Sequence, residues 1–162
     1  GITGWQAAGA TLLLSEVALA GQAPRPVLAQ VHAQRFLDQH ALRDEVFGPS
    51  SLVVRAANVA QALQVLQAVG GSLTVTLLGA QADTPVNRQL VSQAMAIAGR
   101  VLFTGVPTGV AVTAAQQHGG PWPSSTRPET TSVGDAALSR FLRPVCLQDA
   151  PAWLTDRQGL PV

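Results

Sequence analysis

The side chains that could carry chemistry in this chain are few and scattered. Nine carboxylates, three histidines and a single cysteine, Cys146, are spread along 162 residues. No two histidines have the i, i+4 spacing of metal ligands on a helix, so we expect no metal site. The chain contains no lysine, which excludes a P-loop, a pyridoxal phosphate Schiff base and a Ser-Lys dyad.

His118 and Cys146 deserve separate interpretations. His118 precedes Gly119-Gly120 in a glycine-rich stretch, and we expect it to position a loop rather than to act as an acid or base. Cys146 alternates with apolar neighbours in 143–147, which is typical of an inward-facing strand residue. A catalytic cysteine needs an electropositive, partly exposed site, so we predict a structural role for Cys146.

The composition narrows the class of protein. Hydrophobic residues make up 47% and charged residues 12%, which is too apolar for a disordered chain and predicts a surface that faces other protein. A net charge of +1 argues against a nucleic-acid partner. No apolar run is long enough to span a bilayer, so no membrane partner is expected. One cysteine suits a reducing compartment, which favours the cytoplasm.

The beginning of the chain carries a helix signal. Thr3-Gly4-Trp5-Gln6 has the spacing of a capping box and predicts a helix from Thr3 to about Ala20, closed by Gly21. The sequence begins with Gly1 instead of methionine, so we expect it to be cut from a longer polypeptide. Residues 1–20 lack the basic segment that begins a signal peptide, so we expect none here. Pro24 and Pro26 then introduce an extended stretch near Val27–Val31.

From Ser50 the hydrophobic pattern alternates between strand and helix periods. Apolar residues recur at helical spacing in 59–69, and Thr84-Pro85 opens a second helix that ends at Gly99. Strands are predicted for 51–55, 73–77 and 101–103. Strand–helix–strand–helix–strand with short connections gives two consecutive βαβ units in one parallel sheet. The predicted fold class is therefore α/β.

A long connection follows the last of these strands. Residues 105–133 are rich in glycine and proline, with at most a short helix near 110–117. A connection of this length inside a compact domain is usually functional. It leaves the carboxyl end of a strand, where open α/β sheets place ligands. A helix near 135–142 and a short strand at 143–148 complete the prediction.

The segment Asp44-Glu45-Val46-Phe47-Gly48-Pro49 is, by its residue types, a polar turn that enters a strand. As a motif it resembles the aldehyde dehydrogenase superfamily signature, in which the glutamate holds the nicotinamide ribose of the cofactor. A carboxylate can accept hydrogen bonds from two ribose hydroxyls, and a ring two residues later can cover the nicotinamide.

The resemblance continues along the chain to about residue 151. Segments 100–110, 118–123, 130–134 and 140–146 look like the branch that contains α-ketoglutarate semialdehyde (2,5-dioxovalerate) dehydrogenases. The chain departs from that pattern at Thr104, where the branch has asparagine. This difference concerns the part of the site that contacts the substrate and not the assignment to the family.

The resemblance implies an architecture and a set of sites. Residues 1–142 would be the parallel-sheet part of a catalytic domain with an active-site loop at 105–133, and 143–162 an assembly strand and tail. Glu45 and Phe47 would contact NAD or NADP. The loop would line the aldehyde entrance with Pro107, Thr108, Gly109 and Val110. The last strand would join subunits, which implies a homo-oligomer.

The same resemblance implies that a semialdehyde is oxidised to a carboxylate by an upstream cysteine thiolate, with hydride passing to NAD(P). The nucleophile, the general base and the cofactor domain precede this region in the family, and none can be placed on this sequence. We therefore expect the chain alone to be inactive.

Two other interpretations stay open from the sequence. One is a non-catalytic assembly module derived from the same fold, which predicts dimers without nucleotide binding. The other is an unrelated α/β binding protein that shares the turn motif by chance, which predicts a closed domain with one continuous sheet.

Overall fold

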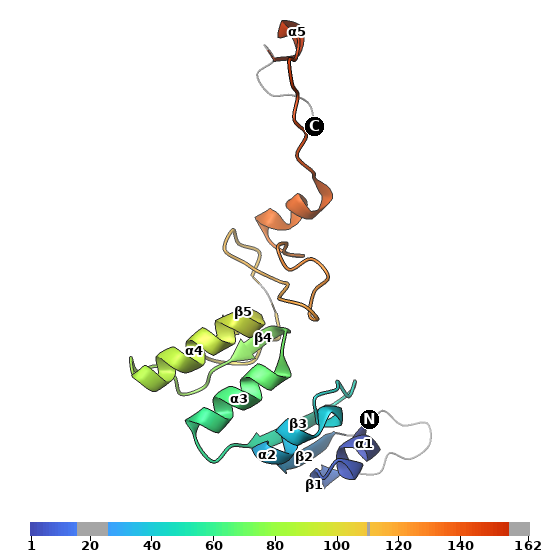
Figure 1. Cartoon of the computed structure of the whole chain (residues 1–162), viewed down its shortest axis with the longest axis vertical. Helices are drawn as coiled ribbons and strands as arrows, with labels where there is room; N and C mark the ends of the chain where they lie inside the picture. Colours follow the sequence, from blue (N-terminus) through green and yellow to red (C-terminus); the bar gives the residue numbers. More distant parts are fainter. Residues whose placement is uncertain (16–25, 110, 156–162) are drawn as a thin grey trace.

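The computed structural model describes residues 1–15, 26–109 and 111–155, and these form a small α/β protein with parallel strands (Figure 1). Val110 and the tail from residue 156 lie outside the described residues. The elements in chain order are α1 (Ile2–Ala7), β1 (Thr11–Ser15), β2 (Val27–His32), α2 (Ala33–Asp38), η1 (His40–Leu42), β3 (Ser50–Arg55), α3 (Val59–Val69), β4 (Ser72–Thr76), α4 (Pro85–Ile97), β5 (Ala98–Leu102), η2 (Asp135–Phe141) and α5 (Ala152–Thr155).

The first sheet has the order β1-β2-β3. β1 pairs antiparallel with β2, and β2 pairs parallel with β3 from Val27↔Ser50 to His32↔Arg55. The crossover between the parallel strands consists of α2 and η1. Alternate side chains of β2 are buried in the hydrophobic core. This core includes Trp5, Ala29, Val31, Phe36 and Leu42. Burial of one strand face against these helices holds this half of the chain together.

The second sheet contains β4 and β5, which are parallel and joined by α4. Thr84 accepts a hydrogen bond from the backbone N–H of Asn87, and Pro85 occupies the first turn, as the sequence predicts for a helix start. Ala94 and Ile97 bury one face of α4. α3 packs against both α2 and α4 (Figure 1). The helices at 59–69 and from Pro85 are therefore confirmed.

The predicted helix from Thr3 to Ala20 is wrong. Gly1, not Thr3, caps α1, and the helix ends at Ala7. Gly9 adopts a φ of 99°, and backbone N–H groups of Gly9 and Ala10 bond to Gln6 and Trp5. This pattern ends a helix, and the β-prone residues from Thr11 then form a strand. Residues 16–20 lie outside the described residues.

The single parallel sheet predicted from β3 to β5 is also wrong. β4-α4-β5 forms the predicted βαβ unit, but β3 bonds to β2 and not to β4. The extended stretch near Val27–Val31 becomes the parallel neighbour of β3 instead. The type and order of these elements were predicted correctly, whereas strand pairing depends on contacts that a local pattern does not encode.

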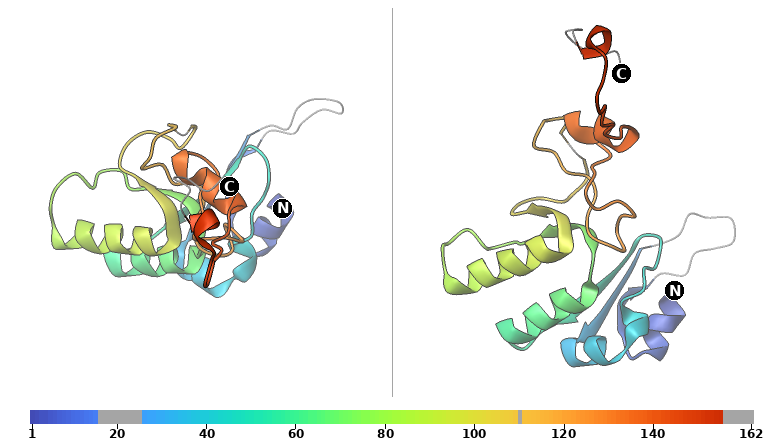
Figure 2. Two further views of the ribbon diagram at one scale, coloured as in Figure 1. Left: turned by 90° about the horizontal axis from the view of Figure 1, so that it is seen from above. Right: turned by 45° about the horizontal axis from the view of Figure 1, so that its top comes forward.

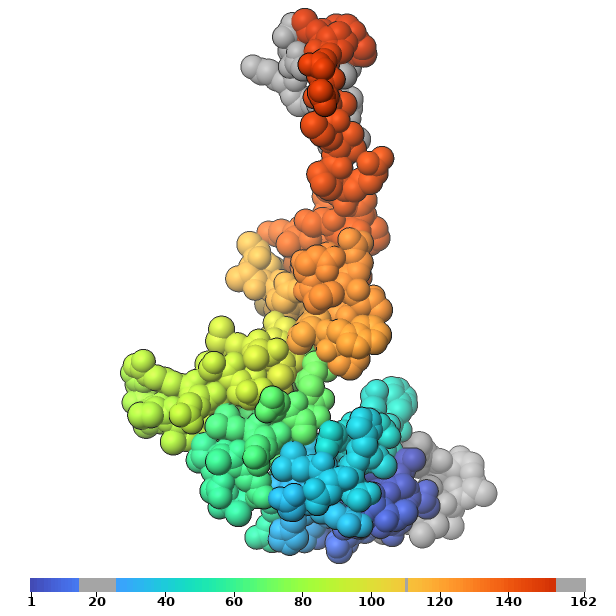
Figure 3. Space-filling view, viewed as in Figure 1, coloured from blue at the N-terminus to red at the C-terminus, as the bar shows by residue number. Residues whose placement is uncertain are grey.

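The last part of the chain differs from its predicted structure. The described residues of 110–117 form no helix, and the helix expected near 135–142 is the 3₁₀ helix η2. The strand predicted at Arg143–Gln148 is absent, and these residues form an exposed coil. The coil extends away from the rest of the described structure (Figures 1 and 3). No other described strand lies beside it to supply hydrogen bonds. Cys146 is therefore exposed rather than inward-facing.

Within the described ranges, no helix combines the length and apolarity that a membrane span requires. The same residues bring no three histidine, cysteine or acidic side chains together in a metal-binding arrangement.

Candidate functional site

A hollow of about 550 Å³ lies at the turn that enters β3. Glu45 and Phe47, the residues predicted to contact a cofactor, both line it. The turn lies where β2 and β3 begin, because the N–H of Val27 donates to the carbonyl of Pro49. The structure thus brings the two predicted cofactor residues to one concave surface.

Alternating burial determines how the turn presents its side chains. Leu42 is part of the core and Val46 packs against it, whereas Glu45 and Phe47 on either side of Val46 are exposed. Phe47 is 96% exposed. A phenyl ring left in water contributes nothing to folding, so its place at the rim of a hollow suits contact with a bound molecule.

Arg43 ties this turn to the end of α2. Its guanidinium donates hydrogen bonds to the carbonyls of Phe36 and Leu37 and lies 6.0 Å from the centre of the Phe36 ring. Carbonyls at a helix C-terminus are left without helical partners and attract a cation. Arg43 therefore fixes the backbone two residues before Glu45.

The other side of the turn is fixed by Ser50. Its hydroxyl donates to the carbonyl of Val46 at 2.8 Å, and its N–H donates to the carbonyl of Gly48 at 2.8 Å. Gly48 has a φ of 136°, a conformation that residues with a β-carbon rarely adopt. Glycine is required here by the backbone, so its place in the motif has a direct structural reason.

Trp5 forms part of the wall of the same hollow. Its indole Nε1 is buried and has no hydrogen-bond partner among the described residues. A buried donor without a partner is costly, so the value of Trp5 to the fold must come from the packing of its ring in the core. Trp5 was not predicted as a residue of this hollow, because no local pattern in the sequence links the first helix to the turn at 44–49.

The chemistry of this hollow fits the nicotinamide riboside half of NAD or NADP. The Glu45 carboxylate can accept from two hydroxyl groups, and the Phe47 ring offers an exposed flat face. No glycine-rich turn for a pyrophosphate is present in the sequence.

The predicted substrate residues lie elsewhere, after β5. Pro107, Thr108 and Gly109 are exposed, and none of them lines the hollow of Glu45. Arg100 Nη1 donates to the carbonyl of Gly109 at 2.8 Å, which ties the loop back to β5. The Nε of Arg100 is buried without a partner among the described residues. Val110, the fourth predicted residue, lies outside them.

The later part of the 105–133 connection is folded by its own hydrogen bonds. Thr131, only 2% exposed, accepts from the N–H of His118 at 2.8 Å and donates to the carbonyl of Val133 at 2.7 Å. The N–H of Ser132 donates to the carbonyl of His118. The backbone of His118 thus takes part in closing this loop, which lies beside β4 and β5 (Figure 2).

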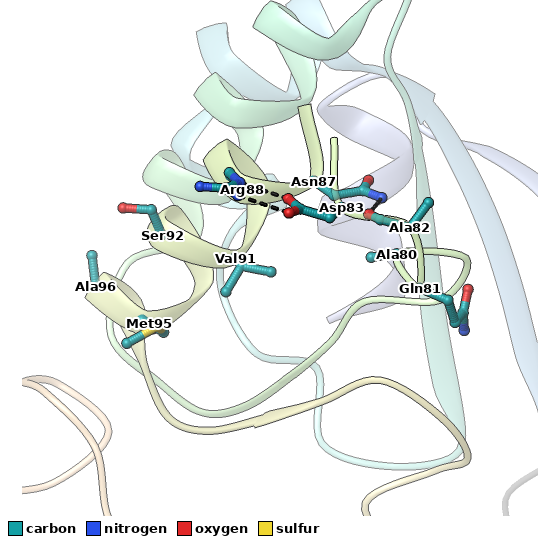
Figure 4. A pocket seen from close by; sticks show the side chains of 10 residues that line it. All are labelled: Ala80, Gln81, Ala82, Asp83, Asn87, Arg88, Val91, Ser92, Met95 and Ala96. Carbon is teal, nitrogen blue, oxygen red and sulfur yellow. Dashed lines mark hydrogen bonds and ion pairs between the residues drawn. The ribbon is translucent and has the colours of Figure 1, made fainter. Parts of the chain in front are cut away.

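A second hollow, of about 660 Å³, lies between α4 and the segment before it. Asp83 and Arg88 form a bidentate ion pair at its rim, while Val91 and Met95 lie along its α4 side (Figure 4). The hydrogen bond from Arg88 holds the pKa of Asp83 below its ordinary value. Because the two charges satisfy each other, this hollow presents mainly an apolar surface.

The chain is related to the aldehyde dehydrogenases, because two curated proteins of this kind match most of it. It is 48% identical over 124 residues to α-ketoglutaric semialdehyde dehydrogenase 2 of Azospirillum brasilense, which covers 76% of this chain and 24% of the relative. It is 42% identical over 136 residues to α-ketoglutaric semialdehyde dehydrogenase of Acinetobacter baylyi, covering 80% of this chain and 26% of the relative. The resemblance read from the turn motif is thereby confirmed.

The chain spans about a quarter of the length of these curated relatives. No protein-family model matches it. A sequence identity of 48% over 124 residues extends far beyond the turn motif. It therefore excludes the interpretation that this chain is an unrelated α/β protein that shares the motif by chance.

Proposed function

We propose that this chain is the C-terminal part of an NAD(P)-dependent aldehyde dehydrogenase that oxidises α-ketoglutaric semialdehyde to the carboxylate. The observation that carries the proposal is the hollow that gathers Glu45 and Phe47 in a chain related to dehydrogenases of that substrate. The nucleophilic cysteine, the general base and the cofactor domain are proposed to come from polypeptide outside this chain. The single cysteine favours a cytoplasmic enzyme.

The chain's own contribution is to hold the nicotinamide end of the cofactor. The bound cofactor supplies the hydride acceptor of the reaction. Glu45 would accept hydrogen bonds from the ribose hydroxyls. The Phe47 ring would cover the nicotinamide and restrict its orientation. Arg43 and Ser50 keep the turn from shifting, which matters because small displacements at a reacting centre cost rate.

The loop after β5 would shape the aldehyde entrance through Pro107, Thr108, Gly109 and Val110. Arg100 supports this role, because its bond to the Gly109 carbonyl holds the described part of the loop against β5. Thr104 replaces the asparagine of the branch and directly precedes this loop, so substrate preference is the property that we expect to differ from the relatives.

The exposed segment after η2 is proposed to assemble subunits. Val145, Leu147 and Trp153 expose apolar side chains on this segment, and no strand among the described residues pairs with it. Such a segment gains hydrogen bonds and buries apolar area when it pairs with another chain. A purely non-catalytic assembly module would share this property, but it would not require the exposed Glu45 and Phe47.

A chimera tests the proposed activity. This chain replaces the matching stretch of the Azospirillum brasilense dehydrogenase, and formation of reduced nicotinamide is followed with α-ketoglutaric semialdehyde. Activity within about tenfold of the parent supports the proposal. A chimera that folds and still binds NAD or NADP but does not oxidise the aldehyde would contradict it and favour the assembly module.

The isolated chain provides the complementary test. We expect no turnover from it with either cofactor, because it lacks a nucleophile and a dinucleotide fold. If turnover survives repurification and disappears in Cys146→Ser, the assignment of the nucleophile to another part of the polypeptide is wrong.

A further inference from the structure

A small hollow of about 290 Å³ lies at the opposite end of the first sheet from Glu45. Its lining includes Gln30 and His32 near the end of β2, and Arg55 at the end of β3. These strands are parallel, so the hollow lies at their carboxyl ends, where open α/β sheets bind ligands. The Glu45 turn precedes β3, roughly 17 Å away along the strand.

The strand register places polar side chains on one face of the sheet. Thr11 pairs with Gln30, and His32 pairs with Arg55. Directly paired residues point to the same side of a sheet. Because Ala29 and Val31 are buried in the core, Gln30 and His32 belong to the opposite face. Thr11 and Arg55 therefore share that outer face.

Arg35 adds a second guanidinium from α2. Its Nε donates to the carbonyl of Ala8 at 2.9 Å, and no partner of its terminal nitrogens is found among the described residues. Gly9 leaves room for this arrangement, since a β-carbon there would stand 2.8 Å from the Arg35 Nε. The guanidinium is thus held from one side while its remaining donors stay available.

The charges in this hollow are not compensated from within it. Arg55 makes no hydrogen bond or ion pair with any residue that the structure describes. No carboxylate lines the hollow, and Asp38 on the same helix as Arg35 accepts from Gln34 instead. Arg88 and Arg127, in contrast, each pair with an acidic side chain. Two uncompensated arginines beside hydroxyl and amide donors are the chemistry that binds an oxyanion.

We propose that this hollow binds a small oxyanion, the phosphate or carboxylate group of a metabolite, between Arg35 and Arg55. Arg55 supplies the free guanidinium fork, while Arg35 supplies its terminal N–H groups from the other side. Thr11 and Gln30 add neutral donors. The site is separate from the proposed cofactor hollow and does not depend on the proposed dehydrogenase activity.

The test is a titration of the whole 162-residue chain with inorganic phosphate at low ionic strength, followed by amide NMR shifts and calorimetry. We expect saturable binding with shifts centred on Gly9, Thr11 and 30–32, and weakening as salt is added. Arg55→Gln should weaken binding by about tenfold or more, since it removes a bidentate charged contact. Arg143→Gln changes the net charge equally but lies in the exposed segment, and should leave binding unchanged.

A parallel titration with α-ketoglutarate distinguishes the two sources of the oxyanion, because the tighter ligand identifies phosphate or carboxylate as the preferred group. Arg35→Gln provides a second variant from another element, and circular dichroism checks that each variant is folded. Absence of saturable binding by both anions, or equal weakening by Arg55→Gln and Arg143→Gln, would overturn the proposal. Neither outcome affects the proposed dehydrogenase function, because no step of this test measures activity.

Discussion

The carbonyl group of Gly119 lies directly against the α-carbon of Gly99, where a β-carbon on Gly99 would overlap it. A β-carbon on Gly71 would likewise overlap the carbonyls of Pro121 and Trp122. The loop at 119–122 therefore lies on the first residues of β5 and on the glycine before β4. These two glycines are what permit backbone to pack so closely on backbone.

Gly99→Ala should destabilise the chain by about 1–3 kcal/mol, because the new methyl group meets a main-chain carbonyl that cannot easily move. Chemical denaturation of the two proteins measures the difference. Gly4→Ala is the matched control: its β-carbon meets nothing within 4 Å and it lies inside α1. That variant should be more stable by about 0.5–1 kcal/mol. Equal stability of wild type and Gly99→Ala would contradict the packing of this loop.

This packing shows where sequence-based prediction was limited. Gly99 was predicted to stop a helix, whereas it lies inside β5 and α4 ends at Ile97. The reason for glycine there is a loop twenty residues later in the chain, which no local pattern reveals. Helices with regular spacing and clear caps, such as the one that begins after Thr84, were predicted correctly because their signals are local.

Only part of the candidate site could be predicted from the sequence. Glu45 and Phe47 belong to a continuous motif that could be recognised, and the structure places both at one hollow. Trp5 comes from a different element and was missed, because only folding brings it to that wall. The apolar run at 10–14 was wrongly predicted to continue the first helix, since short apolar runs fit a buried helix and a strand equally well.

Phe47→Ala should leave the stability of the chain nearly unchanged, because the Phe47 ring is 96% exposed. Phe36→Ala is the matched comparison, since that ring is 4% exposed and lies in the core. It should cost about 3–5 kcal/mol. Thermal melting of both variants measures the contrast. A large loss of stability in Phe47→Ala would mean that the Phe47 ring has a structural role, and Phe47 would then no longer belong to the candidate site.

The Asp83–Arg88 pair predicts a pH-dependent difference in stability. The hydrogen bond from Arg88 lowers the pKa of Asp83 below its ordinary 3.8 in the folded chain. Any stability from this pair is therefore present above pH 3.8 and is lost as the pH falls through the lowered value. Wild type should exceed Asp83→Asn in melting temperature near neutral pH, with the gap closing well below 3.8. In an Arg88→Gln background the gap should be absent at every pH, and a persisting gap would contradict the cause.

The exposed segment after η2 should drive association. Val145 is 63% exposed and Trp153 is 70% exposed, which is unfavourable for an isolated monomer. Light scattering at micromolar concentration should show dimers or larger species of the whole chain. A variant that ends at Leu142 should shift towards monomer while keeping its helical circular dichroism. If the whole chain and the shortened variant are both monomeric, the assembly role is wrong.

In the complete enzyme, Glu45 is proposed to hold the nicotinamide ribose of the cofactor. Glu45→Gln keeps the shape of the side chain but removes the charge that strengthens its hydrogen bonds. In the chimera with the Azospirillum brasilense relative, single-turnover hydride transfer should slow by about ten- to hundred-fold. Cofactor affinity should change less, because the adenosine and pyrophosphate are expected to be held outside this chain. Hydride transfer at the parental rate in a folded Glu45→Gln chimera would show that Glu45 does not hold the ribose.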